Sequence, residues 1–175
     1  WVRAAQDYNA RYGTLFETLG YFEVVRRRYR EADSWYARAI EVQPDLWSAQ
    51  RERGLNLMRL GDKDSARAHL TRAYGGDPYS TATVNTLRLL DSLDQFEVIE
   101  SAPPALRLQL HRTEAAALSP YVQQLSREAI ASFSSRYGWT PTTPLAVEMY
   151  PDHYDFAVRI AGLPGIGLLG VTFGD

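Results

Sequence analysis

The chain has 175 residues, of which 45% are hydrophobic and 23% charged, and its formal net charge is −2. This composition excludes a disordered or low-complexity protein, because aromatic residues alone make up 12% of the chain. No apolar run reaches the roughly 18 residues that a membrane-spanning helix needs, and the balanced charge disfavours general nucleic-acid binding. The absence of cysteine excludes disulfides, thiol nucleophiles and cysteine-ligated zinc.

The two ends of the chain predict that it is a piece of a longer protein. It begins with Trp1 rather than methionine, and it ends at Asp175 just after a glycine-rich stretch, with no helix or strand to close the fold. We therefore expect further sequence on both sides, so the lack of a visible signal peptide carries no information about the compartment.

A 34-residue period runs through the first half of the chain. The residues that recur in register are Gly20 and Gly54, Ala32 and Ala66, Tyr36 and Leu70, Ala39 and Ala73, and Pro44 and Pro78. Two antiparallel helices per repeat explain them: glycine lets the helices approach, alanine allows neighbours to stack, and proline ends the second helix. We predict a partial repeat over 1–12, repeats over 13–46 and 47–80, and a capping helix over 81–94.

This spacing resembles the tetratricopeptide repeat, and the resemblance covers residues 1–94. It implies an α-solenoid whose concave groove is lined by the first helix of each repeat and holds a protein or peptide partner. In that register the groove residues are Tyr21, Val25, Arg51, Leu55 and Met58. The Lys and Asn set with which some members clamp a C-terminal carboxylate is missing. The alternative is that the two repeats only pack against the next domain, since a solenoid usually needs about three repeats.

The chain has one basic cluster, Arg26-Arg27-Arg28-Tyr29-Arg30. The repeat register places this cluster at the turn between two helices, where solvated charge is ordinary. Because the net charge is also balanced, we expect no nucleic-acid partner.

The second half of the chain changes to a mixed pattern. Alternating apolar residues predict strands, at 96–99, 106–111, 145–150 and 170–173. A long helix is expected over 113–137, Asp152 is expected to cap a short helix, and Ala102-Pro103-Pro104 forms a rigid break. The chain is thus predicted to be an α+β protein, in which an N-terminal helical solenoid precedes a partial α/β module of about four strands and one long helix over 95–175.

The order of these elements resembles the upstream part of the peptidase MA-like domain, a gluzincin-type zinc metallopeptidase module. The resemblance covers about 80 residues and rests on Arg136-Tyr137-Gly138-Trp139, Tyr150-Pro151-Asp152, Gly162-Leu163-Pro164-Gly165-Ile166 and Gly170-Val171-Thr172-Phe173-Gly174. It implies that a helix with an H-E-x-x-H motif follows. It also implies that Gly170, Val171, Thr172 and Phe173 form an edge strand that pairs with extended substrate; an ordinary interior strand is the alternative.

No catalytic residue or metal ligand can be assigned within the chain. None of His69, His111 and His153 begins an H-E-x-x-H motif, and a zinc site needs three or four converging ligands. The G-x-G-x-x-G match over 165–170 lacks the preceding strand and following helix of a dinucleotide site, so we interpret it as accidental. We expect no cofactor in this chain, and zinc only if the longer protein carries the downstream motif.

Two functions therefore remain open from the sequence. In the first, a repeat protein binds a protein or peptide partner and continues into a zinc metallopeptidase, in which zinc-bound water attacks a peptide carbonyl. In the second, the protein is a non-catalytic adaptor and its α/β module only binds. Downstream sequence separates the two, and we expect the chain by itself to be inactive.

Overall fold

The computed structural model describes residues 1–102 and 105–174; Pro103 and Pro104, part of the predicted rigid break, lie outside the described residues. The predicted α+β class is confirmed, since a helical region precedes a small sheet. The chain divides into two compact units, one that joins Trp1–Leu90 to the segment from Ala157 onward, and one that spans Asp91–Phe156. The expected boundary near residue 94 therefore misses that the last part of the chain packs with the helices.

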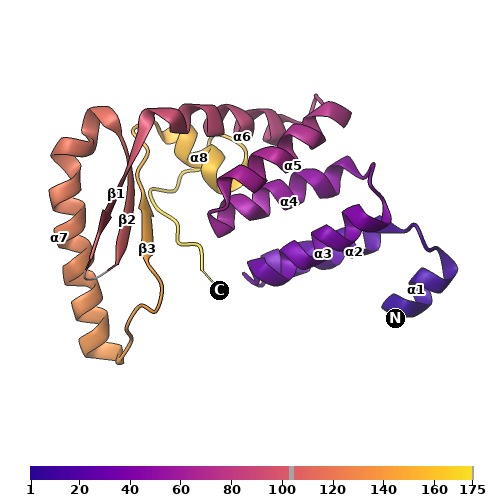
Figure 1. Ribbon diagram of the computed structural model, residues 1–175, viewed down its shortest axis with the longest axis horizontal. Helices are drawn as coiled ribbons and strands as arrows, with labels where there is room; N and C mark the ends of the chain where they lie inside the picture. Colours follow the sequence, from indigo (N-terminus) through magenta and orange to yellow (C-terminus); the bar gives the residue numbers. More distant parts are fainter. Residues whose placement is uncertain (103–104, 175) are drawn as a thin grey trace. The chain divides into compact units, whose positions relative to one another are not determined.

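The first unit consists mainly of helices in sequence order (Figure 1). They are α1 (Val2–Tyr8), α2 (Gly13–Val25), α3 (Tyr29–Val42), α4 (Trp47–Leu60), α5 (Lys63–Gly76) and α6 (Thr81–Ser92). α2 packs against α3, and α4 against α5, so each predicted repeat forms one helical hairpin. α3 also packs against α4, which joins the two hairpins into one array.

The 34-residue period is repeated in the packing as well as in the sequence. A Cβ atom on Gly20 would lie 2.6 Å from the Tyr36 ring, and a Cβ atom on Gly54 would lie 2.6 Å from Cγ of Leu70. The recurring alanines are also buried, namely Ala32, Ala39, Ala66 and Ala73. Each hairpin therefore closes where a glycine of its first helix meets the equivalent large residue of its second helix.

The turns inside the two hairpins use the same backbone conformation but different residues. Arg27 (φ 62°) makes the turn of the first hairpin, and Gly61 (φ 83°) makes that of the second. These positions are 34 residues apart. A side chain is strained in the left-handed region, whereas glycine is not. Arg28 of the same basic cluster forms an ion pair with Glu23.

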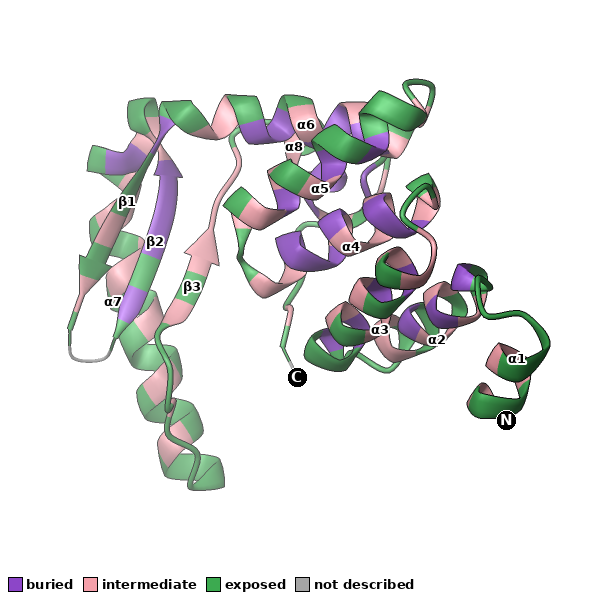
Figure 2. Cartoon of the chain, turned by 45° about the vertical axis from the view of Figure 1, so that its right-hand side comes forward, coloured by how far each residue is buried: buried purple, intermediate pink, exposed green. Residues whose placement is uncertain are grey.

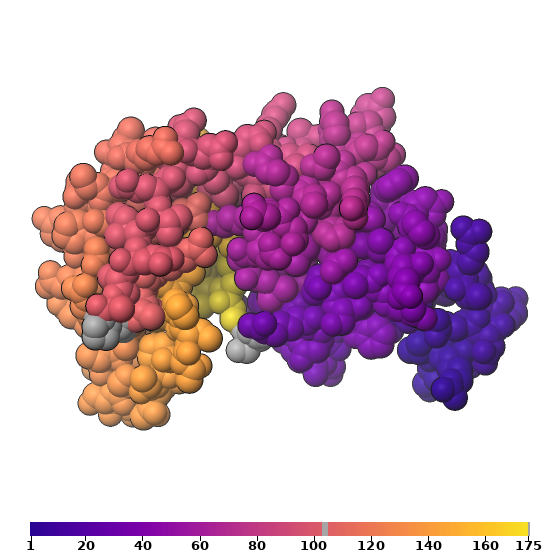
Figure 3. All heavy atoms as spheres, in the orientation of Figure 1, coloured from indigo at the N-terminus to yellow at the C-terminus, as the bar shows by residue number. Residues whose placement is uncertain are grey.

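α1 contributes little to the packing of the helical unit. None of its residues is buried, and it is exposed on most sides (Figure 2). Its atoms form the indigo part of Figure 3, and its Val2 packs against the cluster around Phe16.

α8 (His153–Ala161) leads the chain back to the helical unit, to which its second half belongs. Asp152 accepts a hydrogen bond from the Tyr154 backbone N–H at 2.8 Å, as expected of a cap. Gly162 follows α8 directly, and its carbonyl oxygen accepts a hydrogen bond from Nδ2 of Asn85 in α6 at 3.3 Å. A Cβ atom on Gly162 would lie 3.0 Å from that of Ala82, so α8 ends close against α6.

The prediction of a fourth strand is wrong. Residues 163–174, which include Gly170, Val171, Thr172 and Phe173, belong to no helix or strand. The residues there have the alternating apolar pattern of a strand, but a strand also needs a neighbouring strand with which its backbone groups form hydrogen bonds. Instead, the Phe173 ring lies against Tyr29 of α3, with ring centroids 6.4 Å apart.

The second unit is a three-stranded sheet with one long helix. Its elements are β1 (Phe96–Ser101), β2 (Leu106–His111), α7 (Arg112–Tyr137) and β3 (Leu145–Glu148). β2 is central, with Phe96 of β1 opposite His111 in an antiparallel pair and Leu145 of β3 opposite Leu106 in a parallel pair. The three remaining predicted strands are thus confirmed, although β3 ends two residues before the expected Tyr150.

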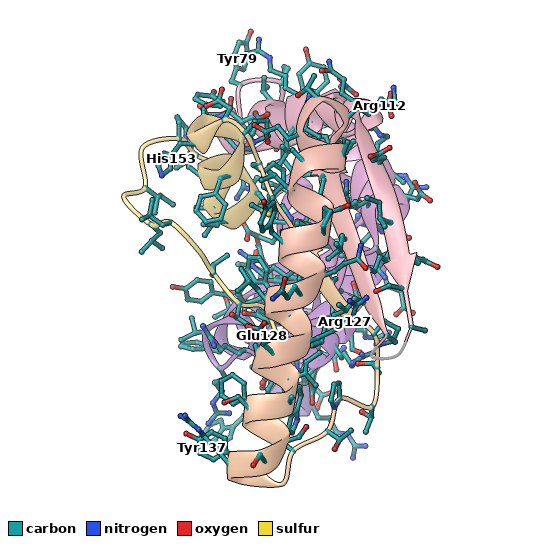
Figure 4. All side chains as sticks on the ribbon, turned by 90° about the vertical axis from the view of Figure 1, so that its left-hand side faces the viewer. Tyr79, Arg112, Arg127, Glu128, Tyr137 and His153 are labelled. Atoms are coloured by element: carbon teal, nitrogen blue, oxygen red, sulfur yellow. The ribbon has the colours of Figure 1, made fainter. Side chains whose placement is uncertain are left out.

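α7 covers the sheet with its first half only. Leu108, Leu110 and Ala115 form the buried core, against which Leu118 and Val122 of α7 pack. Farther along the same helix several apolar residues are exposed, Leu125 by 64%, Phe133 by 53% and Tyr137 by 71%, while Ile130 is partly buried. Figure 4 shows Tyr137 at the end of α7 opposite to Arg112.

Candidate peptide-binding face

The first helices of the two hairpins, α2 and α4, carry the predicted groove residues. Tyr21 and Val25 of α2 are exposed by 56% and 62%, and Leu55 of α4 is partly buried. These three positions are accessible or partly accessible on α2 and α4, and we call them the inner face; their role in a groove stays a prediction. Met58, by contrast, is exposed by only 2%. It belongs to the core, so its assignment to the groove is wrong.

Arg51 is partly buried and held by its neighbour in sequence. Its Nε lies 3.1 Å from Oε1 of Glu52. Both side chains are about one quarter exposed, at 27% and 28%. A partly exposed ion pair of this kind contributes little to stability, but it neutralises the charge that a ligand would meet at Arg51.

Electrostatic interactions connect the inner face to a second group of residues. Burial raises the pKa of the Tyr36 phenol, and the nearby carboxylate of Glu52 raises it further. Tyr21 of the inner face and Arg59 of α4 also act on the Tyr36 phenol, in opposite directions. Tyr21, Glu52 and Arg59 therefore all lie near the Tyr36 phenol.

Arg59 extends this network toward the C-terminal segment. Burial lowers the pKa of its guanidinium, whereas Glu52, Tyr29 and Tyr36 act in the opposite direction. The charge of Arg159, from α8, lowers the pKa of Arg59 further. The guanidinium groups of Arg59 and Arg159, from α4 and α8, thus lie near one another.

Phe173 lies between two of these residues. Its ring packs edge-on against Tyr29, at an interplanar angle of 70°, and the guanidinium carbon of Arg159 lies 4.9 Å from its ring centroid. Tyr29 is exposed by 6% and Arg159 by 9%. We call Tyr29 and Arg159 the aromatic site, because both contact the one ring.

Asn56 fixes the backbone beneath the aromatic site. It is fully buried, and its Nδ2 donates a hydrogen bond to the Tyr29 carbonyl oxygen at 2.8 Å. This bond ties α4 to the first residue of α3. Tyr29 is therefore held at the junction between the two hairpins by its backbone, in addition to the contact of its ring with Phe173.

Sequence reasoning missed Tyr29, Arg159 and the contact of both with Phe173. Tyr29 lies inside the basic cluster, whose charges predict a solvated turn, and Arg159 lies in a short helix far along the chain. Their meeting depends on the return of α8 to the helical unit, and no sequence period indicates that return.

The three histidines serve helix contacts and ends. Nδ1 of His69 lies 2.7 Å from Oε1 of Gln50, which links α5 to α4. Burial lowers the pKa of His69, and the charges of Arg53 and Arg72 lower it further. His111 accepts a hydrogen bond from the Thr113 backbone N–H at the start of α7, and His153 is the first residue of α8.

Two searches of the described residues bear on metals and membranes. No group of three or more His, Asp and Glu side chains within 1–102 and 105–174 is arranged to hold a metal ion. In the same part of the chain, no helix combines the length and apolar character that crossing a membrane requires.

Comparison with known proteins leaves the geometry as the main guide to function. No protein family model matches the chain, and no curated protein sequence matches it significantly. The resemblances to the tetratricopeptide repeat and to the peptidase MA-like domain therefore rest on the residues quoted for them above.

Proposed function

We propose that the helical unit is a protein-interaction module of the tetratricopeptide type, which binds an extended peptide segment of a partner along its inner face. One observation carries the proposal. Tyr21 and Val25 are more than half exposed, although α2 already buries Gly13, Phe16 and Gly20 on its other side. A helix that is apolar on two sides usually packs on both, so the exposed side calls for a partner.

The size of this apolar surface suits a peptide. A buried aliphatic or aromatic side chain contributes roughly 1.5–3 kcal/mol, and roughly 8 kcal/mol corresponds to micromolar affinity. Three or four such anchors are enough, and Tyr21, Val25 and Leu55 supply that number together with the adjoining aromatic site. The ion pairs and tyrosines around Arg59 would fix the orientation of the bound backbone.

The proposal is tested by truncating the exposed apolar side chains of α2. The double variant Tyr21→Ala, Val25→Ala should bind peptides from a random extended library at least about tenfold more weakly than the unchanged chain. Tyr79→Ala is the matched control, because Tyr79 is 92% exposed and lies outside the inner face. Equal affinities of the double variant and the unchanged chain, measured by calorimetry, would reject the inner face as a binding site.

A second proposal concerns the sheet unit. Its order of β1, β2, α7 and β3, with α7 packed on one face of a mixed sheet, favours the front part of a gluzincin-like zinc metallopeptidase within a longer protein. The non-catalytic adaptor is the alternative. Peptide hydrolysis that requires zinc and a downstream H-E-x-x-H motif in that longer protein would support the peptidase; a longer protein without the motif would leave the adaptor.

A further inference from the structure

We infer that the aromatic site, Tyr29 and Arg159, is where the helical unit accepts an aromatic side chain of an extended peptide, and that Phe173 of the same chain is its internal occupant. This inference rests on the proposed peptide-binding function, and it names the chemistry of the ligand. The partner is a peptide with one Phe, Tyr or Trp in an extended stretch, and it competes with the chain's own C-terminal segment.

The two contacts with Phe173 use different parts of an aromatic ring. Tyr29 meets the ring at 70° in an edge-to-face arrangement, which aromatic quadrupoles favour. Arg159 presents its guanidinium 4.9 Å from the ring centroid, within the range of a cation–π interaction. An aliphatic side chain would keep the packing but lose both electrostatic contributions, so the site selects aromatic residues.

The elements that carry the aromatic site are anchored by contacts other than those with Phe173. Asn56 bonds the carbonyl of Tyr29, and α8 is fastened to α6 by the contacts of Gly162 with Asn85 and Ala82. Tyr29 and Arg159 are exposed by 6% and 9% with Phe173 in place, and a peptide ring that replaced Phe173 would meet the same two side chains. A peptide in trans can therefore use the site that Phe173 uses in cis.

The segment between Gly162 and Phe173 leaves open space around several of its residues. An added Cβ at Gly165, Gly167 or Gly170 would meet no atom within 4 Å. Leu169 is exposed by 96%. Leu163, Leu168 and Val171 are exposed by 46%, 47% and 39%, whereas Phe173 contacts two buried residues. The ring, more than the general hydrophobicity of the segment, holds it on the helices.

A labelled peptide with the sequence of residues 166–174 tests the inference directly by fluorescence anisotropy. It should bind the Phe173→Ala chain about tenfold more tightly than the unchanged chain, because the internal competitor is removed. Replacing Phe by Ala in the peptide should weaken binding to the Phe173→Ala chain by about tenfold, and replacing it by Trp should not. Leu169→Ala in the chain is the control, and this variant should bind the labelled peptide with the same affinity as the unchanged chain.

Variants of the site separate this inference from the function on which it rests. Arg159→Gln should lower the affinity for the Phe peptide several-fold while leaving the affinity for the Ala peptide unchanged. Equal binding of the Phe and Ala peptides to the Phe173→Ala chain would overturn the aromatic site. The wider peptide-binding function would then stand or fall on the Tyr21→Ala, Val25→Ala variant and its library peptides, whose readout does not involve Phe173.

Discussion

The two helical hairpins place equivalent residues in opposite environments. Tyr21 of the first hairpin corresponds to Leu55 of the second, and Phe22 corresponds to Asn56, each pair being 34 residues apart. Phe22 is 56% exposed and Asn56 is fully buried. Asn56 is covered because α3 lies beside α4 and Tyr29 accepts its hydrogen bond. The corresponding side of α2 has only the short α1 before it in the chain.

This difference shows that a repeat sequence specifies the contacts within each hairpin but not the elements that cover it. The closure of each hairpin is local, since Gly20 meets Tyr36 and Gly54 meets Leu70 by the same geometry. The exposure of each first helix is decided by its neighbours, which the period does not specify. The two most exposed residues of the inner face, Tyr21 and Val25, lie on the hairpin whose first helix is covered least.

The largest effect on the stability of the helical unit should come from truncating the closing residues, Tyr36 and Leu70, the large side chains that pack against the glycines of the two hairpins. Leu70→Ala and Tyr36→Ala should each lower the free energy of unfolding by about 2–5 kcal/mol, because both side chains are almost fully buried. Leu125→Ala is the control, since Leu125 is 64% exposed and its change should stay within about 0.5 kcal/mol. Urea denaturation measures all three. A loss below about 1 kcal/mol at either closing residue would show that the two hairpins do not close alike.

The glycines opposite these residues should give the next largest effect. Gly20→Ala and Gly54→Ala should each cost about 1–3 kcal/mol, because the new methyl group overlaps the Tyr36 ring or Leu70. Gly75→Ala in α5 is the matched control, since no atom lies within 4 Å of its added Cβ. That control should be neutral or stabilise the helix by up to about 1 kcal/mol. Stabilisation by Gly20→Ala would contradict the close approach.

Exchanging the turn residues should shift stability in opposite directions in the two hairpins. Arg27→Gly should stabilise the protein by about 0.5–1 kcal/mol, because it relieves a side chain at φ 62°. Gly61→Ala should destabilise it by about 1 kcal/mol, because it introduces a side chain at φ 83°. Thermal and urea unfolding of both variants sharpen the comparison. A loss of stability in Arg27→Gly would mean that the arginine side chain, and not the backbone, determines the first turn.

The smallest expected effect is a pH dependence confined to the second hairpin. His69 corresponds to Trp35 of the first hairpin, which stacks on Phe16 and does not titrate. Burial lowers the pKa of folded His69, so the unfolded chain, with a pKa of about 6.5, takes up its proton first. This contribution to stability is complete above about pH 6.5 and is lost as the pH falls below it.

Hydrogen exchange at several pH values between about 7.5 and 5.5 measures this effect for each helix. Exchange in α4 and α5 should accelerate as the pH falls, after correction for the intrinsic rates, and exchange in α2 and α3 should change less. His69→Gln should reduce the difference. An equal response of both hairpins, or one unaffected by His69→Gln, would contradict the assignment.

The sequence predicted the parts of the fold whose contacts lie close together in the chain. The helical hairpins follow from Gly20, Tyr36 and their counterparts because both partners of each contact lie within one period. The strands of the sheet follow from alternating apolar residues, such as Leu106, Leu108 and Leu110. Met58 was placed on the wrong side because its burial depends on which elements cover α4, and the period carries no information about them.

The candidate site was predicted only in part, for the same physical reason. Tyr21 and Val25 follow from the repeat register. The aromatic site does not, because Tyr29 and Arg159 come from elements that are distant in sequence and meet through the return of α8. The strand-like pattern ending in Phe173 predicted a sheet edge, whereas the ring instead contacts two buried side chains of the helical unit.

The central claim is that the helical unit binds an extended peptide through an aromatic residue at Tyr29 and Arg159. The most direct measurement is photo-crosslinking of the Phe173→Ala chain with the residue 166–174 peptide, in which benzoylphenylalanine replaces the aromatic residue. Mass spectrometry then identifies the modified residues. The account predicts adducts at the start of α3 and in the second half of α8, and their loss when unlabelled Phe peptide is added in excess. Adducts concentrated on the exposed half of α7 or around Tyr79, or adducts that excess Phe peptide does not reduce, would contradict it.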